Sequence, residues 1–212
     1  MIHVKNVKIL STAGEQGAAK VLKKGFSFEC SLVNLLVGDQ GCGKSTLLRM
    51  LQKNSKDLKL DLAEHVIRDS VQSYYFDSEK DNPRVKNPEL YTTMSGQDVG
   101  IGVGGAIASR FKSHGEIMQW MVINPLTTAE NCVVLLDEPE SGLSLTNQLR
   151  LIREIGAAVE RGCQFFIATH CYPLIEAYDV VSLEHWKTMK GADFIKLARE
   201  KRYDRQEKDS SD

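Results

Sequence analysis

The sequence lacks an excess of charge of either sign. Its 212 residues carry 27 Lys+Arg against 28 Asp+Glu, which gives a formal net charge of -1. A chain without a basic field does not attract polyanions in general. Composition therefore neither implies nor excludes a role on nucleic acid.

The sequence also lacks paired cysteines and long apolar runs. None of its 5 cysteines shows the C-x-x-C spacing of metal and redox sites. No stretch approaches the roughly 18 apolar residues of a membrane-spanning helix, and residues 1–10 do not resemble the apolar core of a signal peptide. We therefore expect a reduced, cytoplasmic protein without direct membrane insertion.

What the sequence does contain is a glycine-rich loop, Gly38-Asp39-Gln40-Gly41-Cys42-Gly43-Lys44-Ser45, which fits the phosphate-loop pattern G-x-x-x-x-G-K-[ST]. An apolar run predicts a strand before it, over 33–37, and a leucine stripe predicts a helix after it, over 44–53. Backbone N–H groups at such a turn bind phosphate oxygens. We expect this whole loop and Thr46 to bind a nucleotide, with Lys44 on the β- and γ-phosphates and Ser45 on Mg²⁺.

The rest of the chain alternates between strand and helix patterns, which predicts an α/β domain with a largely parallel sheet. Two period-two runs near the N-terminus predict an antiparallel β portion. We expect one domain over 1–190 and a charged peripheral helix and tail over 191–212. Further strands are expected over 58–62, 73–76, 132–136, 164–168 and 180–183, a helix over 113–124 that Pro125 ends, and a helix over 144–161 with Leu145, Leu149, Ile152, Ile155 and Val159 on its apolar face.

Polar side chains follow two of these expected strands. Asp137 and Glu138 end one strand, and His170 follows the next. Ligands gather at the carboxyl ends of parallel strands, so we expect these residues beside the phosphate loop. Asp137 is suited to hold Mg²⁺, and Glu138 is suited to act as the general base that activates water. A neutral His170 could contact the terminal phosphate or the attacking water, so the expected catalytic residues are Lys44, Glu138 and His170.

Three motifs in order carry a resemblance. Over about 33–172 the sequence resembles the ABC-type ATPases. The phosphate loop resembles their Walker A motif. Their Walker B motif and D-loop are matched by Asp137-Glu138-Pro139-Glu140-Ser141-Gly142-Leu143-Ser144, and their switch histidine by Ala168-Thr169-His170. The resemblance implies a P-loop NTPase fold of the ABC type, with helices on both faces of the sheet. It also implies ATP as substrate, Mg²⁺ as cofactor, hydrolysis, and a homodimer that sandwiches two nucleotides.

In this family a signature motif from the partner subunit completes each site. Ser95-Gly96-Gln97 resembles part of the transporter signature, but it lies far before Asp137 and opens no periodic helix. Ser113-His114-Gly115-Glu116 opens the helix that runs toward Asp137, and we choose it as the signature that acts in trans. The same four residues also fit an ordinary Ser-x-x-Glu capping box. A Ser-x-Gly-Glu signature resembles the soluble SMC-like and OLD-like branch of the family.

Several family features are missing from the sequence. The interval from Lys44 to Ser113 is too short for coiled-coil arms, and no room is left for a nuclease domain. Gln72 precedes its strand and is not a secure Q-loop glutamine. Phe26 and Phe28 are the candidates for stacking on adenine, although their pattern fits the core of the N-terminal β portion better.

Three functions fit these residues. The first is a compact ABC-type ATPase whose ATP-dependent dimer drives a protein partner or a process on DNA. The second is the ATP-binding subunit of a membrane transporter. The third is a P-loop kinase, which the Asp137-Glu138 pair and His170 disfavour.

Overall fold

The computed structural model describes residues 1–10, 22–63, 73–78, 116–117 and 119–209. Its strands are β1 (Val4–Ile9), β2 (Ser27–Glu29), β3 (Val33–Val37), β4 (Leu58–Leu62), β5 (Ser73–Asp77), β6 (Val133–Asp137), β7 (Gln164–Ala168), β8 (Val180–Ser182) and β9 (Lys187–Met189). Its helices are α1 (Lys44–Gln52), the π-helix η3 (Gln119–Ile123), α4 (Asn124–Leu126), α5 (Leu145–Glu160), α6 (Tyr172–Ala177) and α7 (Gly191–Asp209). No helix within these ranges is both long and apolar enough to span a membrane.

Two sheets organise these elements. The six-stranded sheet has the order β5-β6-β7-β3-β8-β9, with parallel pairing from β5 to β8 and an antiparallel β9 at its edge. The three-stranded sheet has the order β2-β1-β4 and is antiparallel. Both predicted sheets are therefore confirmed. The strand over 58–62 belongs to the N-terminal sheet, because β4 pairs with β1.

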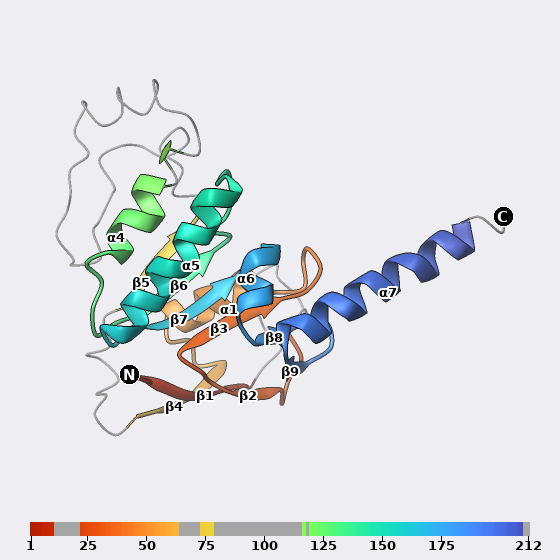
Figure 1. Ribbon diagram of the computed structural model, residues 1–212. Helices are drawn as coiled ribbons and strands as arrows, with labels where there is room; N and C mark the ends of the chain where they lie inside the picture. Colours follow the sequence, from red (N-terminus) through yellow and green to blue (C-terminus); the bar gives the residue numbers. More distant parts are fainter. Residues whose placement is uncertain (11–21, 64–72, 79–115, 118, 210–212) are drawn as a thin grey trace.

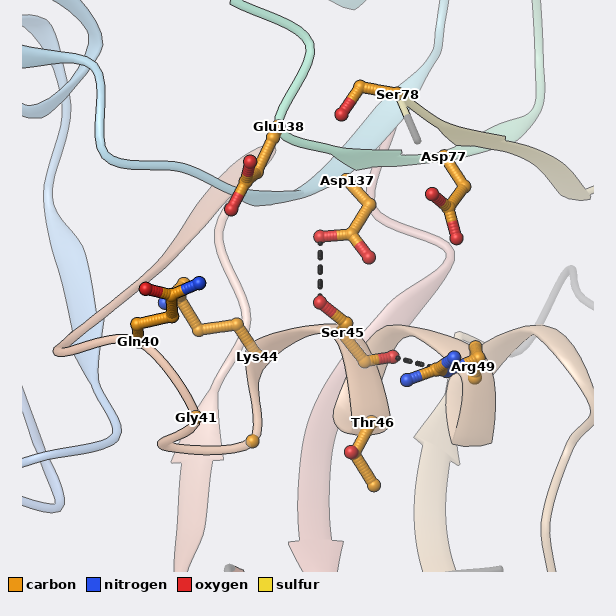
Figure 2. A pocket seen from close by; sticks show the side chains of 11 residues that line it. Gln40, Gly41, Lys44, Ser45, Thr46, Arg49, Asp77, Ser78, Asp137 and Glu138 are labelled. Atoms are coloured by element: carbon orange, nitrogen blue, oxygen red, sulfur yellow. Dashed lines mark hydrogen bonds between the residues drawn. The ribbon is translucent and has the colours of Figure 1, made fainter. Parts of the chain in front are cut away.

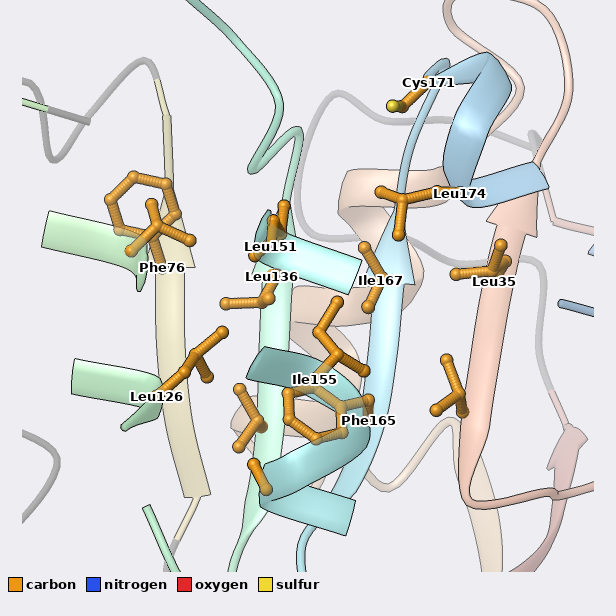
Figure 3. Packing of buried hydrophobic residues seen from close by; sticks show 14 of the residues in the cluster. Leu35, Phe76, Leu126, Leu136, Leu151, Ile155, Phe165, Ile167, Cys171 and Leu174 are labelled. Atoms are coloured by element: carbon orange, nitrogen blue, oxygen red, sulfur yellow. The ribbon is translucent and has the colours of Figure 1, made fainter. Parts of the chain in front are cut away.

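Both faces of the parallel sheet are buried. Alternate residues of β7 point to opposite sides, so that Phe165 and Ile167 join one apolar cluster and Phe166 joins the other. Helices α5 and α6 cover the first side, while α1 and the antiparallel sheet cover the second (Figure 1). In Figure 3, Leu151 and Ile155 of α5 face β6 and β7. This double coverage explains why the central strands β3, β6 and β7 are mostly apolar, with only Asn34, Asp137 and Gln164 as polar residues.

One buried side chain ties the two sheets together. Gln164, at the start of β7, is fully buried. Its Oε1 accepts bonds from the backbone N–H groups of His3 (2.9 Å) and Val4 (2.8 Å). Its Nε2 donates to the carbonyl oxygens of Val4 (2.9 Å) and Ser31 (3.0 Å). The amide thus bonds to backbone groups of His3 and Val4 at the start of β1 and of Ser31 just before β3.

Replacing Gln164 with Leu is expected to lower the free energy of unfolding by about 2–4 kcal/mol, because buried backbone groups lose their partners while volume is nearly kept. Urea denaturation measures the change. The matched control is Gln52→Leu, since Gln52 is exposed at the end of α1. A loss equal to that of the control would contradict a structural role for the amide.

The expected apolar face of α5 is partly wrong. Leu145 and Leu149 are 62% and 55% exposed, whereas Leu151 and Ile155 are fully buried. Leu151, not on the predicted face, packs against the sheet together with Ala158. The helix therefore presents to the sheet a face rotated from the one that its N-terminal leucines suggest. Ser144 caps the helix, since its side chain accepts a bond from the N–H of Asn147.

The expected helix end at Pro125 is also wrong. The chain forms a π-helix over Gln119–Ile123 and continues directly into α4, Asn124–Leu126. Pro125 lies at the second position of α4, and the helical segment continues past it to Leu126. Helix α6 and strand β9 carried no periodic signal because they contain only 6 and 3 residues.

Candidate functional site

The phosphate loop joins the end of β3 to the start of α1. Gly38, Gly41 and Gly43 have φ angles of 142°, 81° and 100°, which side-chain-bearing residues rarely adopt. A Cβ on Gly38 would lie 2.8 Å from Sγ of Cys42 and 3.3 Å from the backbone N of Glu184. No described side chain caps α1, so its first N–H groups are left for an anion.

Lys44 is held over this loop. Its side chain is buried, and its Nζ donates to the carbonyl oxygens of Gly38 (3.1 Å) and Asp39 (3.2 Å). These two bonds hold the Lys44 ammonium group at the centre of the loop. Phosphate oxygens can take over from the carbonyl groups, since an ammonium group has three donors.

Ser45 and Asp137 meet across α1 and β6, although 92 positions separate them in sequence. The Ser45 hydroxyl donates to Oδ1 of Asp137 at 3.0 Å (Figure 2). Asp77 lies opposite Asp137 on β5, and the Tyr75 hydroxyl is 3.5 Å from a carboxylate oxygen of each. Two carboxylates at the ends of neighbouring strands and two hydroxyls, those of Ser45 and Tyr75, therefore gather at one place.

Burial dominates the electrostatics of Asp137. It raises the pKa of this carboxyl from 3.8 to about 6; the Ser45 hydrogen bond opposes the rise, and the charges of Asp77 and Glu138 add to it. A nearby cation would reverse the shift, because it stabilises the carboxylate. The Asp137 carboxylate would therefore be stabilised by a cation bound beside it.

The donor set fits Mg²⁺ only together with a phosphate group. Within the described ranges, no group of three or more His, Cys, Asp or Glu side chains could hold a metal ion alone. Mg²⁺ usually binds one or two carboxylates and completes its shell with water and phosphate oxygens. Ser45 and Asp137, with Asp77 beside them, match that pattern.

Glu138 and His170 approach each other from β6 and β7. The Nε2 of His170 lies 3.9 Å from Oε1 of Glu138, and both side chains are about half-exposed. Burial and the charge of Lys44 lower the pKa of His170, while Glu138 and Asp39 partly oppose this effect. The net lowering of the pKa favours the neutral imidazole. Glu138 adopts a φ of 50°, a strained backbone for a residue with a side chain and one that often marks a functional position.

A cavity of about 260 Å³ connects most of these groups. The candidate site residues that line it include Lys44, Ser45, Asp137 and Glu138. His170 does not line it and lies next to Glu138. Three other lining residues were missed by the sequence reasoning: Arg49, Asp77 and Ser78. For Asp77 a signal existed, because it ends its strand with an acid as Asp137 does.

Comparison with known proteins identifies the fold. No protein-family model matches the sequence, and no curated protein matches it either. Solved structures do match. A bacterial Atm1-family ABC exporter with ATP bound is 15% identical over 93% of this chain, with a TM-score of 0.59; this chain covers only 41% of the exporter chain. The chain has the fold of ABC ATPase domains.

Two further structures match over nearly their whole length. The ATP-binding cassette MJ0796, in a dimeric post-hydrolysis state bound to ADP and phosphate, is 14% identical, with a TM-score of 0.56. The match covers 90% of this chain and 98% of the cassette. The ATP-binding subunit of an ABC transporter is 17% identical over 93% of each chain, with a TM-score of 0.55. The predicted fold class is thereby confirmed, and these identities support the fold alone.

Some expectations of the ABC motifs fall outside the described residues. These are Ser113, His114 and Gly115 of the chosen signature, the alternative Ser95-Gly96-Gln97, and Gln72. Glu116 is described and is exposed on a helical turn. The two phenylalanines considered for adenine belong to the second apolar cluster, where Phe28 is buried and Phe26 packs against Trp186 at a ring-centroid distance of 5.3 Å.

Proposed function

We propose that this protein is a Mg²⁺-dependent ATPase of the ABC type. The observation that carries the proposal is the convergence of the Lys44 ammonium group, the Ser45–Asp137 pair and the Glu138 carboxylate on one cavity. These groups match the requirements of phosphoryl transfer to water. Phosphates need cationic and N–H donors, a metal needs oxygen ligands, and water needs a base.

Each residue has a distinct task in this proposal. The loop N–H groups and Lys44 bind the β- and γ-phosphates, and Ser45 and Asp137 hold the metal. Bound Mg²⁺ would supply neutralisation of the phosphate charge. Glu138 accepts a proton from the attacking water, and its partial exposure lets water reach it. Neutral His170 orients the water or a γ-phosphate oxygen, since an imidazole carries one donor and one acceptor.

We further propose an ATP-dependent homodimer in which Ser113, His114, Gly115 and Glu116 of one copy complete the site of the other. The dimeric state named for the ATP-binding cassette MJ0796 supports this arrangement. The SMC-like or OLD-like branch, and a protein partner or DNA as the target of the dimer, rest on the Ser-x-Gly-Glu pattern.

The second candidate function is the ATP-binding subunit of a transporter. The names of two similar structures, an ABC exporter and the ATP-binding subunit of an ABC transporter, support this function as much as the first one. Purification of the protein with an integral membrane protein, in an ATP-dependent manner, would favour this candidate over a soluble role.

Nucleotide binding by a Lys44→Ala variant tests the proposal. We expect its affinity for ATP to fall about 10- to 100-fold, because a charge-assisted hydrogen bond to phosphate is lost. Isothermal titration with Mg-ATP measures the change, and Lys5→Ala, on an exposed position of β1, is the matched control. Equal affinity in the two variants would overturn the assignment of the loop.

A further inference from the structure

The C-terminal helix α7 contacts the phosphate loop. The helix begins at Gly191, where a Cβ would clash with the carbonyl oxygen of Ile175 in α6, so its first turn lies tightly against the domain. Phe194 and Ile195 then pack against the first apolar cluster. Two turns later, Lys201 contacts the loop. The rest of the helix then projects away from the domain (Figure 1).

Lys201 forms two ion pairs there. Its Nζ lies 3.0 Å from Oδ2 of Asp39, the second residue of the loop. It also bonds to Oε1 of Glu184, which follows β8. The backbone N of Glu184 is the same atom that lies against Gly38. The two ion pairs therefore join α7, the segment after β8 and the start of the phosphate loop.

The Asp39 carboxylate poses an electrostatic problem for the proposed function. The loop must accept a polyanion, yet Asp39 places a negative charge within it, and the Lys44 ammonium group is bonded to its carbonyl oxygen at 3.2 Å. A carboxylate in this loop repels phosphate groups bound there unless a cation offsets its charge. Lys201 is such a cation, and its bonds to Glu184 and Asp39 raise its pKa, so it stays charged at neutral pH.

We propose that Lys201 is a positioning residue for nucleotide binding, which offsets the charge of Asp39 and orients its side chain away from the bound polyphosphate. The inference rests on the proposed function, because it requires a nucleoside polyphosphate in the loop. It assigns to the helix over 191–209 a role at the site. Lys201 acts through Asp39 and does not contact the substrate.

A double-mutant cycle tests the inference. The affinity for Mg-ATP is measured by isothermal titration for the wild type, Lys201→Ala, Asp39→Asn and the double variant. We expect Lys201→Ala to weaken binding about two- to fivefold, the usual scale of exposed ion pairs. Asp39→Asn removes the charge that Lys201 offsets, so adding Lys201→Ala to it should change nothing further.

Two additional measurements separate this role from a structural one. The effect of Lys201→Ala should shrink when salt is raised from low concentration to about 0.5 M, because screening weakens the repulsion by Asp39. Lys201→Arg should bind ATP like the wild type. The matched control is Lys190→Ala, since Lys190 forms a comparable exposed ion pair with Asp179 at 2.9 Å, and it should leave affinity unchanged.

The outcomes distinguish the inference from the proposed function. Wild-type affinity in Lys201→Ala, with lost affinity in Lys44→Ala, would overturn the inference alone. An equal loss from Lys201→Ala with and without Asp39→Asn would also overturn it, because Lys201 would then act independently of Asp39. If Lys201→Ala fails to fold, Asp39→Asn alone still decides: we expect tighter binding, because a negative charge leaves the loop while Lys201 stays, and equal or weaker binding would overturn the inference. Full affinity in Lys44→Ala would overturn the proposed function itself.

Discussion

Replacing Glu138 with Gln is expected to lower ATP hydrolysis at least about 100-fold while ATP binding stays intact, because the amide cannot accept the proton of the attacking water. Ser45 and Asp137, the proposed metal ligands, are untouched by this change. Phosphate release measures hydrolysis, and isothermal titration measures binding. The pair of results separates the chemical step from nucleotide affinity.

The matched control is Glu160→Gln, at the exposed end of α5 and remote from the cavity. A Glu138→Gln variant that hydrolyses ATP like this control would contradict the role of general base. Since the variant should hold ATP without turnover, it should accumulate as a dimer in light scattering with Mg-ATP. Monomers alone would contradict the proposed sandwich, and transfer of phosphate to an acceptor other than water would favour a kinase.

The phosphate loop and the central strands were predictable because their signals are local. Each of β3, β6 and β7 is covered on both faces, so each appears in the sequence as a short apolar run. The loop needs glycines because its backbone has positive φ angles at these positions. The glycines in the sequence therefore already indicate this conformation. The position of Asp137 follows from the same logic, because a polar residue at the carboxyl end of a parallel strand faces the ligand edge.

The features that sequence reasoning missed depend on packing between distant segments. The rotated face of α5 was hidden because Leu145 and Leu149 continue its apolar periodicity although nothing in the described residues covers them. The contact between Lys201 and Asp39 joins positions 162 residues apart. In the sequence, Lys201 is one of many lysines and arginines in a charged C-terminal helix, and nothing local indicates that it contacts the phosphate loop. For Asp77 a local signal existed at the end of its strand, but only the in-register pairing of β5 with β6 places it opposite Asp137.

The site is built at a cost to the stability of the metal-free protein. Asp137 is buried, and its pKa in the folded state, about 6, lies above its ordinary value of 3.8. The folded protein thus binds this proton more tightly than the unfolded chain does. The carboxyl group's contribution to stability is most favourable below about pH 4 and is lost as the pH rises toward 6. At neutral pH the carboxylate therefore opposes folding, and a bound cation would offset that penalty.

Replacing Asp137 with Asn is accordingly expected to have two opposite effects. In the absence of metal at pH 7, the free energy of unfolding should rise by about 1–3 kcal/mol, and this gain should disappear near pH 4. Mg²⁺-dependent hydrolysis should fall at least about 100-fold, because an uncharged amide is a poor ligand for Mg²⁺. Urea denaturation at both pH values measures the first effect, with Asp61→Asn on the exposed side of β4 as the control. A variant less stable than the wild type at pH 7 would mean that the bond from Ser45 outweighs burial, and that Asp137 serves the fold rather than a cation.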